Sequence, residues 1–229
     1  LGGNGTDLTH RLDRFRRETG KRAADARSLA QRWARLAGGG TGGNLAAGYH
    51  LARAFPDRVA QAAGARGRFR LANGRQASLD QTDALAGQPF LVVTDVTGAA
   101  ATGRIRAAAL LARDEIEDLF AHRITATTSL TYDASSASVR ARRTRQLDAL
   151  KLADEPAPVD DPEAAAGLLA QAAARRGLDL LPWSRDQAAW RARATFLHTT
   201  LGDEWPDLSA QALGSSVDDW LTPALFGLT

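Results

Sequence analysis

Hydrophobic side chains recur every three or four residues in the first fifty positions of the chain, a spacing that predicts amphipathic helices. Helices are predicted over residues 7–20, 21–37 and 44–54. The stretch GGGTGGN at 38–44 separates the second helix from the third, because a run of glycines disfavours helical backbone. The chain therefore begins as a helical segment.

After Pro56 the hydrophobic period shortens to two, as in half-buried strands. Strands are predicted over residues 58–62, 67–72, 75–79, 89–97 and 103–110. Between the second and third of them, Asn73-Gly74 predicts a two-residue type I′ hairpin turn. Five strands in a meander, followed by a short helix opened by Asp114, indicate a small barrel such as an OB fold rather than a βαβ sheet. Periodicity alone does not distinguish an OB fold from other small barrels.

Two more alternating stretches, 124–133 and 138–147, predict additional strands. The acidic, proline-rich sequence DEPAPVDDP at 154–162 is predicted to be a linker. Helical spacing then returns over residues 162–177, 184–201, 209–213 and 215–221. The predicted fold class is α+β: a helical segment, a small OB-like β-barrel with extra strands, and a small α-helical C-terminal module.

The composition excludes several classes of protein. Among 229 residues there is no cysteine, which excludes disulfides and thiolate metal sites and favours a cytoplasmic location. The four histidines are scattered without the spacing of a metal motif, so we expect no metal. No apolar run approaches the length of a membrane span, so we expect no membrane partner. Because the sequence contains no methionine, we expect a piece of a longer protein.

Charge is distributed unevenly along the chain. Residues 1–149 carry 23 basic and 14 acidic side chains, a net charge of +9, whereas residues 150–229 carry 6 and 12, a net charge of −6. Such asymmetry indicates a basic part that contacts an anion and an acidic part with a different role. Of the 29 basic residues 27 are arginine, a good bidentate ligand for phosphate, although a GC-rich genome also produces arginine-rich chains.

Three basic clusters lie within the +9 segment. The first is the helical pair 11–35, the second is the predicted hairpin with the strand after it, and the third is RARRTR at 140–145. For any single cluster a solvated face is a sufficient explanation, but three clusters together favour nucleic acid. The predicted nucleic-acid-binding residues are Arg66, Arg68, Arg70, Arg75, Arg104, Arg106, Arg140 and Arg142. The only aromatic residues interleaved with them are Phe69 and Tyr132, so base stacking is weakly supported.

No motif of catalysis is complete. RRETGKR at 16–22 has Phe15 where a phosphate-binding loop needs glycine and Arg22 where it needs serine or threonine. GGGTGGN follows no strand and lacks the dinucleotide-binding spacing, and no G-x-S-x-G sequence occurs. We therefore predict no catalytic, cofactor-binding or metal-binding residues.

Several stretches in combination resemble a known family. NLAAGYHLARAFPDRVAQ, GRFRLANGRQASL and PFLVVTDV resemble the segment after the helical bundle in HrpB-type DEAH-box ATP-dependent RNA helicases. GLDLLPWSRDQAAWRARATFLH, EWPDLS and DDWLTPAL resemble the C-terminal region of the same family. The resemblance covers nearly the whole chain.

The resemblance implies four parts: the end of a helical bundle at 1–43, an OB-like barrel domain at 44–120, extra strands at 121–153 and a family-specific helical extension at 154–229. It also implies that the motor lobes, with the P-loop, the DEAH box and the arginine finger, lie upstream. The parent helicase would then use ATP and Mg²⁺, whereas this fragment would use no cofactor and would not hydrolyse ATP. The final ALFGLT is expected to be a truncation point.

Three functions remain to be distinguished. The favoured one is a non-catalytic accessory region of an RNA helicase that binds single-stranded RNA or DNA and packs on the helicase's own motor lobes. The alternative is a docking module, in which the acidic helical part binds a protein partner and the arginines form intramolecular salt bridges. A stand-alone enzyme of another type is the third, and a cluster of titratable groups in one cleft would favour it.

Overall fold

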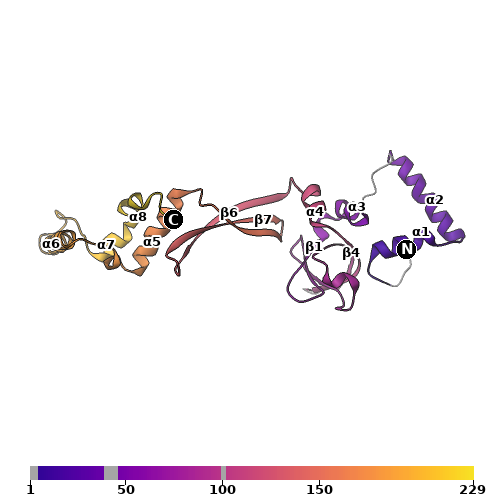
Figure 1. The fold of residues 1–229 in the computed structure, drawn as a ribbon, viewed down its shortest axis with the longest axis horizontal. Coiled ribbons are helices and arrows are strands. Elements are labelled where there is room, and N and C mark those ends of the chain that lie inside the picture. Colours follow the sequence, from indigo (N-terminus) through magenta and orange to yellow (C-terminus); the bar gives the residue numbers. More distant parts are fainter. Residues whose placement is uncertain (1–4, 39–45, 99–101) are drawn as a thin grey trace. The chain divides into compact units, whose positions relative to one another are not determined.

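A computed structural model of the chain describes residues 5–38, 46–98 and 102–229 (Figure 1). It divides into two compact units. The first contains residues Leu1–Thr125 and Arg145–Leu152, and the second contains Ala126–Thr144 and Ala153–Thr229. The four-part division expected from the sequence stays a prediction.

The first helices form where the hydrophobic spacing predicts them. They are α1 (Leu8–Arg17), α2 (Lys21–Leu36) and α3 (Ala47–Ala54). The Asp7 carboxylate accepts a hydrogen bond of 2.8 Å from the backbone N–H of Thr9 and so caps α1. Gly20, with φ of 129°, separates α1 from α2. The predicted break at 38–44 lies outside the described residues, apart from Gly38.

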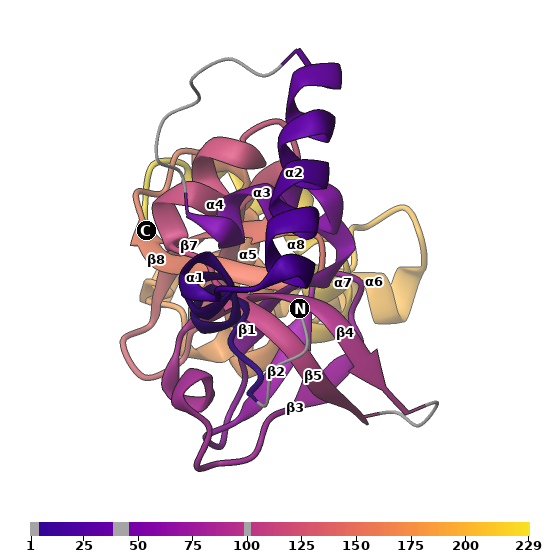
Figure 2. The same cartoon turned by 90° about the vertical axis from the view of Figure 1, so that its right-hand side faces the viewer.

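Five strands close into a barrel in the order β1-β2-β3-β5-β4 (Figure 2). They are β1 (Val59–Ala62), β2 (Arg68–Leu71), β3 (Gln76–Ser78), β4 (Phe90–Thr97) and β5 (Thr102–Leu110). All pairs are antiparallel except β3 and β5, which run parallel. The spacing of the strands suggested a simple meander. The parallel pairing of β3 and β5 instead gives the five-stranded arrangement of an OB-like barrel.

The barrel interior is filled by the inward residues of the alternating strands, including Phe69, Leu91 and Val93. A second buried cluster lies where α3 and α4 (Arg113–Leu119) pack against the barrel, and it includes Ile116 and Leu147. Together these two clusters form the core of the first unit.

The hairpin between β2 and β3 has a different turn from the predicted one. The backbone N–H of Gly74 donates to the carbonyl of Leu71 at 2.8 Å, and the N–H of Leu71 donates to the carbonyl of Arg75 at 2.8 Å. Only Gly74 has a left-handed φ, of 84°, whereas a type I′ turn needs two such residues. The prediction of a two-residue turn was wrong because the loop holds three residues and ends in a bulge at Gly74. The Asn73 side chain accepts a hydrogen bond of 3.1 Å from the Arg75 N–H in this loop.

Arg58 lies in the 3-10 turn Pro56–Arg58 that leads into β1. Its guanidinium donates to the carbonyl of Thr94 at 2.8 Å and lies 5.3 Å from the centre of the Phe55 ring. The β4–β5 ladder is irregular at Thr94, between Val93 and Asp95. Arg58 therefore satisfies a carbonyl beside the irregularity, which is a structural role.

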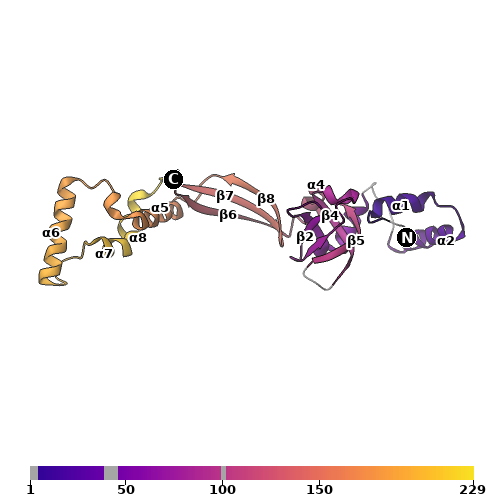
Figure 3. The same ribbon diagram turned by 90° about the horizontal axis from the view of Figure 1, so that it is seen from below.

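Three more strands form a separate sheet in the order β6-β7-β8 (Figure 3). They are β6 (Ile124–Asp133), β7 (Ser138–Leu147) and β8 (Leu150–Ala157). The strand β8 includes residues 154–157, which the sequence analysis assigned to the linker. Leu150 and Leu152 anchor its beginning in the core of the first unit, and Pro156 is tolerated because β8 is an edge strand.

The rest of the second unit is helical, as predicted. Its helices are α5 (Pro162–Arg176), α6 (Arg185–Leu201), α7 (Ala210–Ser215) and α8 (Val217–Trp220). Ser184 caps α6, accepting a bond of 3.2 Å from the Gln187 N–H. The Trp183 and Trp220 rings lie 5.9 Å apart, whereas Trp190 is 58% exposed, so only some of the tryptophans anchor the module.

Candidate nucleic-acid interface

The outer face of the barrel carries arginines because β2 alternates strictly. Phe69 and Leu71 point into the core, with 1% and 3% of their surface exposed, so Arg68 and Arg70 point outward. Phe69 is therefore unable to stack on a base. Its position among the arginines suggested a platform for base stacking, but the buried ring cannot serve as one.

The strand register extends the row of outward side chains across three strands. Arg68 is paired with Ser78 of β3, and Ser78 is paired with Arg104 of β5. The Cα atoms of Arg68 and Arg104 are therefore about 10 Å apart, which is two strand spacings, and the two side chains lie on the same face of the sheet. Arg106 follows two residues after Arg104 and is also exposed. We call Arg68, Arg70, Arg104 and Arg106 the arginine face; Figure 2 shows β2, β3 and β5 side by side.

The charges of the arginine face are mostly uncompensated. Within the described ranges, the side chains of Arg68, Arg70 and Arg106 form no hydrogen bond or ion pair. Arg104 lies near Asp80 of the β3–β4 loop, whose pKa is lowered first by hydrogen bonds from Thr82 and further by the Arg104 charge. Three of the four guanidinium groups are thus available to an external anion.

Arg66 and Arg75 flank β2 at its two ends. The Arg66 guanidinium is already in use: it donates to the carbonyl of Gln81 at 2.9 Å and lies against Gly87. Arg75 follows the bulge at Gly74, and its side chain is exposed. Arg75 lies opposite the inward Leu71 and has the same strand parity as the buried Ala77, so it is exposed at the end of the hairpin but is not part of the arginine face. Of these two predicted site residues, neither therefore belongs to the arginine face, and Arg66 holds a loop.

Arg140 and Arg142 belong to the second unit and are paired with acids there. Arg140 lies 2.7 Å from an Asp133 carboxylate oxygen. Arg142 donates to both the carboxylate and the backbone carbonyl of Asp154, at 2.7 and 2.9 Å. The eight predicted residues thus fall into two groups, and the charges of the second group are largely neutralised. Tyr132, the other predicted aromatic, accepts a bond of 3.3 Å from Arg176.

Sequence reasoning missed the uncharged polar residues between the arginines. Gln76 is paired with both Arg70 and Thr102, and Ser78 lies between Arg68 and Arg104. A two-residue turn would have placed Ala77 opposite Arg70 instead. The missed signal was Gly74, because glycine after a type I turn often marks a bulge that shifts the register by one residue.

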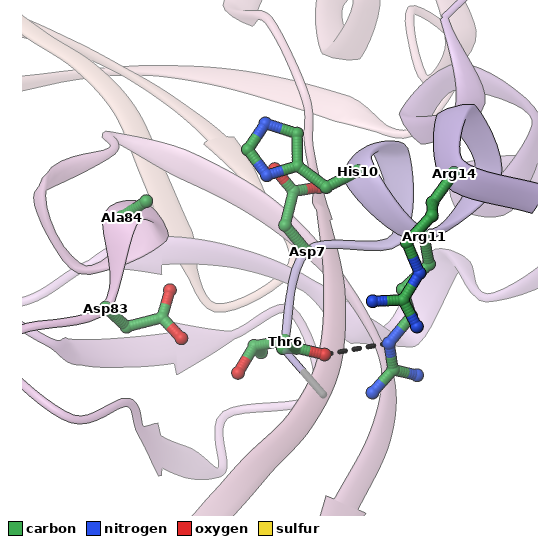
Figure 4. A pocket seen from close by; sticks show the side chains of 8 residues that line it. Thr6, Asp7, His10, Arg11, Arg14, Asp83 and Ala84 are labelled. Carbon is green, nitrogen blue, oxygen red and sulfur yellow. Dashed lines mark hydrogen bonds and ion pairs between the residues drawn. The ribbon is translucent and has the colours of Figure 1, made fainter. Parts of the chain in front are cut away.

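A pocket of about 380 Å³ opens between the start of α1 and the loop 79–89 (Figure 4). It is lined by both signs of charge, with Arg11 and Arg14 on one side and Asp7 and Asp83 on the other. Arg11 donates to the carbonyl of Gly5 at 2.7 Å, and Asp83 caps the 3-10 turn Ala84–Gly87 through a bond of 2.9 Å from the Leu85 N–H. These contacts give the pocket a structural role.

Residues 5–38, 46–98 and 102–229 hold no group of three or more histidine, cysteine, aspartate or glutamate side chains suited to a metal ion. None of the helices described is long and apolar enough to cross a membrane.

Comparisons with known proteins find a curated relative and several matching chains of solved structure, whereas no family model matches the chain. The relative is the ATP-dependent RNA helicase HrpB of Escherichia coli, which is 27% identical over 181 residues, 78% of this chain and 22% of that protein. The chain thus spans about a fifth of the length of its relative. A crystal structure of the E. coli DEAH/RHA helicase HrpB matches 99% of this chain and 28% of its own, at 20% identity and a TM-score of 0.51. A crystal structure of the E. coli DExH-box NTPase HrpB covers 79% of this chain and 23% of its own, at 26% identity and a TM-score of 0.45.

The relationship and the fold agree. Homology over most of the chain supports the resemblance to HrpB-type helicases that the sequence motifs indicated, and the closed barrel with its helices is confirmed as an α+β, OB-like fold. The chain is related to an accessory region of a helicase.

Proposed function

We propose that this chain, as the C-terminal region of an HrpB-type helicase, holds single-stranded nucleic acid against the outer face of its barrel. One observation carries the proposal: Arg68, Arg70, Arg104 and Arg106 lie on one open face, and the side chains of three of them have no hydrogen-bond or ion-pair partner among the described residues. OB folds bind oligonucleotides on the face of strands 2 and 3, which is the face that carries Arg68 and Arg70 here.

The chemistry of the face suits phosphates rather than bases. Guanidinium groups bind phosphate oxygens in a bidentate manner, and each neutralised phosphate releases counterions. Gln76 and Ser78, which lie between the arginines, add neutral hydrogen-bonding groups. The proposed ligand is the backbone of single-stranded RNA or DNA, held with an affinity that falls as salt rises.

The role within the whole protein is part of the same proposal. The parent would be a cytoplasmic, ATP-dependent helicase that binds ATP and Mg²⁺ in motor lobes outside this chain, and the present region would pack on those lobes. It would supply binding surface and no catalytic group. The acidic helical part would be the place for a protein partner.

Internal ion pairing, the alternative function of the arginines, has its own support in the second unit. Arg140 and Arg142 each pair with an aspartate, and Arg191 pairs with Asp179 at 3.0 Å. For these residues we therefore favour a structural role over nucleic-acid binding.

The two roles are separated by fluorescence anisotropy of a labelled single-stranded RNA titrated with the chain at low salt. The test variant is R68Q/R104Q on the arginine face, and R140Q/R142Q is a control that removes the same charge from the second unit. We expect the first variant to weaken binding by about tenfold or more, because two phosphate contacts are lost, and the control to change it by less than about threefold. Equal losses of RNA affinity in the two variants would mean that only net charge matters. If the unmodified chain did not bind RNA at all, the nucleic-acid role would be contradicted and the docking function would be favoured.

A further inference from the structure

The strand β6 forms one edge of the three-stranded sheet, and in the described part of the chain no strand pairs with its outer side (Figure 3). Its residues Ala126–Ser129 are exposed on both faces of the sheet. An edge strand of this length presents a row of unpaired backbone N–H and C=O groups, which is a template for another strand.

The two edges of this sheet differ in their protection against such pairing. The edge strand β8 carries Asp154, Glu155 and Pro156 near its end, and charges and proline are the usual devices that block edge-to-edge association. The edge strand β6 has no proline, and its one charged residue, Asp133, is its last and is paired with Arg140, so from Ile124 to Tyr132 the edge is uncharged. The protection is thus confined to one edge.

A second copy of β6 is the strand that fits this edge. Between two copies, any pairing that involves β8 meets its acids and its proline, which leaves β6 against β6. In an antiparallel pair centred on Thr128, Thr128 lies opposite its own copy and Thr127 lies opposite Ser129, which are favourable cross-strand combinations. On β7, one strand further in, Arg140 and Arg142 are paired with aspartates and Arg145 with Glu117, which reduces the positive charge beside the edge.

We propose that two copies of the chain associate through antiparallel pairing of their β6 strands, giving a continuous six-stranded sheet with two-fold symmetry. The contact is isologous and closed, because each β6 edge is used once and the outer edges are the protected β8 strands. A strand edge buries less than the roughly 1,200–2,000 Å² of a stable interface, so the dimer is weak and reversible.

The test is sedimentation velocity of the chain from about 5 to about 500 µM, together with hydrogen exchange of the β6 amides over the same range. The test variant A126K/T128K places two charges on the exposed side chains of one face of β6, and the control E155K makes the same change in net charge on β8. Far-UV circular dichroism checks that each variant is folded. We expect the mass of the unmodified chain to rise from 24.3 kDa toward twice that value, and the β6 amides to exchange more slowly at high concentration.

We expect A126K/T128K to weaken the association by about tenfold or more, with E155K close to the unmodified chain. A chain that stays monomeric with fast-exchanging β6 amides at every concentration would overturn the proposal. So would a dimer that A126K/T128K does not weaken, which would place the contact on another surface, such as the exposed Trp190 and Phe196 of α6. Equal weakening by both variants would also overturn it, because net charge alone would then explain the effect.

Discussion

At the scale of single residues, the arginine face depends on the glycine that precedes it. Gly67 stands between Arg66 and Arg68 with a left-handed φ of 81°, and a Cβ there would lie 2.7 Å from the carbonyl oxygen of Leu79. Its own N–H donates to the carbonyl of Ala86 at 3.0 Å. The backbone at this point thus needs both the conformation and the small size of glycine to start β2 where it does.

Gly67→Ala is predicted to destabilise the barrel by about 2–3 kcal/mol, since a strained backbone conformation and a steric overlap add together. Gly64→Ala is a matched control, because Gly64 has a φ of 77° and no atom within 4 Å of the added Cβ. We expect that control to lose only about 1 kcal/mol. Urea unfolding followed by far-UV circular dichroism measures both, and equal losses would show that the contact with Leu79 does not matter.

At the scale of elements, α4 is joined to β7 through one carboxylate. Glu117 accepts hydrogen bonds from Arg113 at 3.0 Å and from Arg145 at 3.2 Å. The pKa of Glu117 is lowered mainly by the bond from Arg113 and further by Arg145, against the opposing effect of burial. Because the unfolded chain then binds the proton more readily than the folded one, this contribution to stability is present above the ordinary glutamate pKa and is lost as pH falls through the lowered value.

With Glu117→Gln, the free energy of unfolding of the first unit is therefore predicted to fall less steeply between about pH 5 and about pH 3 than in the unmodified chain. The measurement is urea unfolding at a series of pH values in that range. Glu155→Gln serves as the control, because the Glu155 side chain is exposed and has no hydrogen bond or ion pair within the described residues. A variant at Glu117 with the same pH dependence as the unmodified chain would contradict the assigned role of the two bonds.

The positions of the strands were predictable from the sequence, whereas their register and pairing were not. The five barrel strands lie within one or two residues of their predicted ranges, because inward and outward side chains alternate clearly in each. The register between β2 and β3 was not predictable from that alternation, since the bulge at Gly74 shifts it by one residue. The pairing of Ser78 with Arg104 follows from the parallel contact of β3 and β5, which no local pattern contains.

The same limit applies to the charges. Alternation placed Arg140 and Arg142 on one face of a strand, but it gave no information about Asp154, which lies on the next strand and binds Arg142. A basic run in a sequence therefore predicts a charged face, whereas the acids that neutralise it become visible only when the strands are paired. Sequence analysis joined into one site eight arginines that belong to two units.

At the scale of the whole molecule, the division into two compact units predicts unfolding in more than one step. Four of the five tryptophans, Trp183, Trp190, Trp205 and Trp220, belong to the second unit and report on it by fluorescence. The core of the first unit contains Leu91, which is fully buried.

Leu91→Ala is predicted to destabilise the first unit by about 2–5 kcal/mol through the cavity that it leaves. In guanidinium titrations the far-UV transition should shift to lower denaturant, while the tryptophan fluorescence transition of the second unit stays in place. Coincident transitions that shift together would contradict the independence of the two units.

The most direct test of the proposed interface is the salt dependence of RNA binding. If the four arginines of the arginine face each neutralise one phosphate, the logarithm of the binding constant should fall with the logarithm of salt concentration with a slope of about −3. R68Q/R104Q should make that slope shallower by about 1.4, since two of the four contacts are removed. A slope that this variant leaves unchanged, or binding that does not respond to salt, would contradict the assignment of phosphate binding to this face.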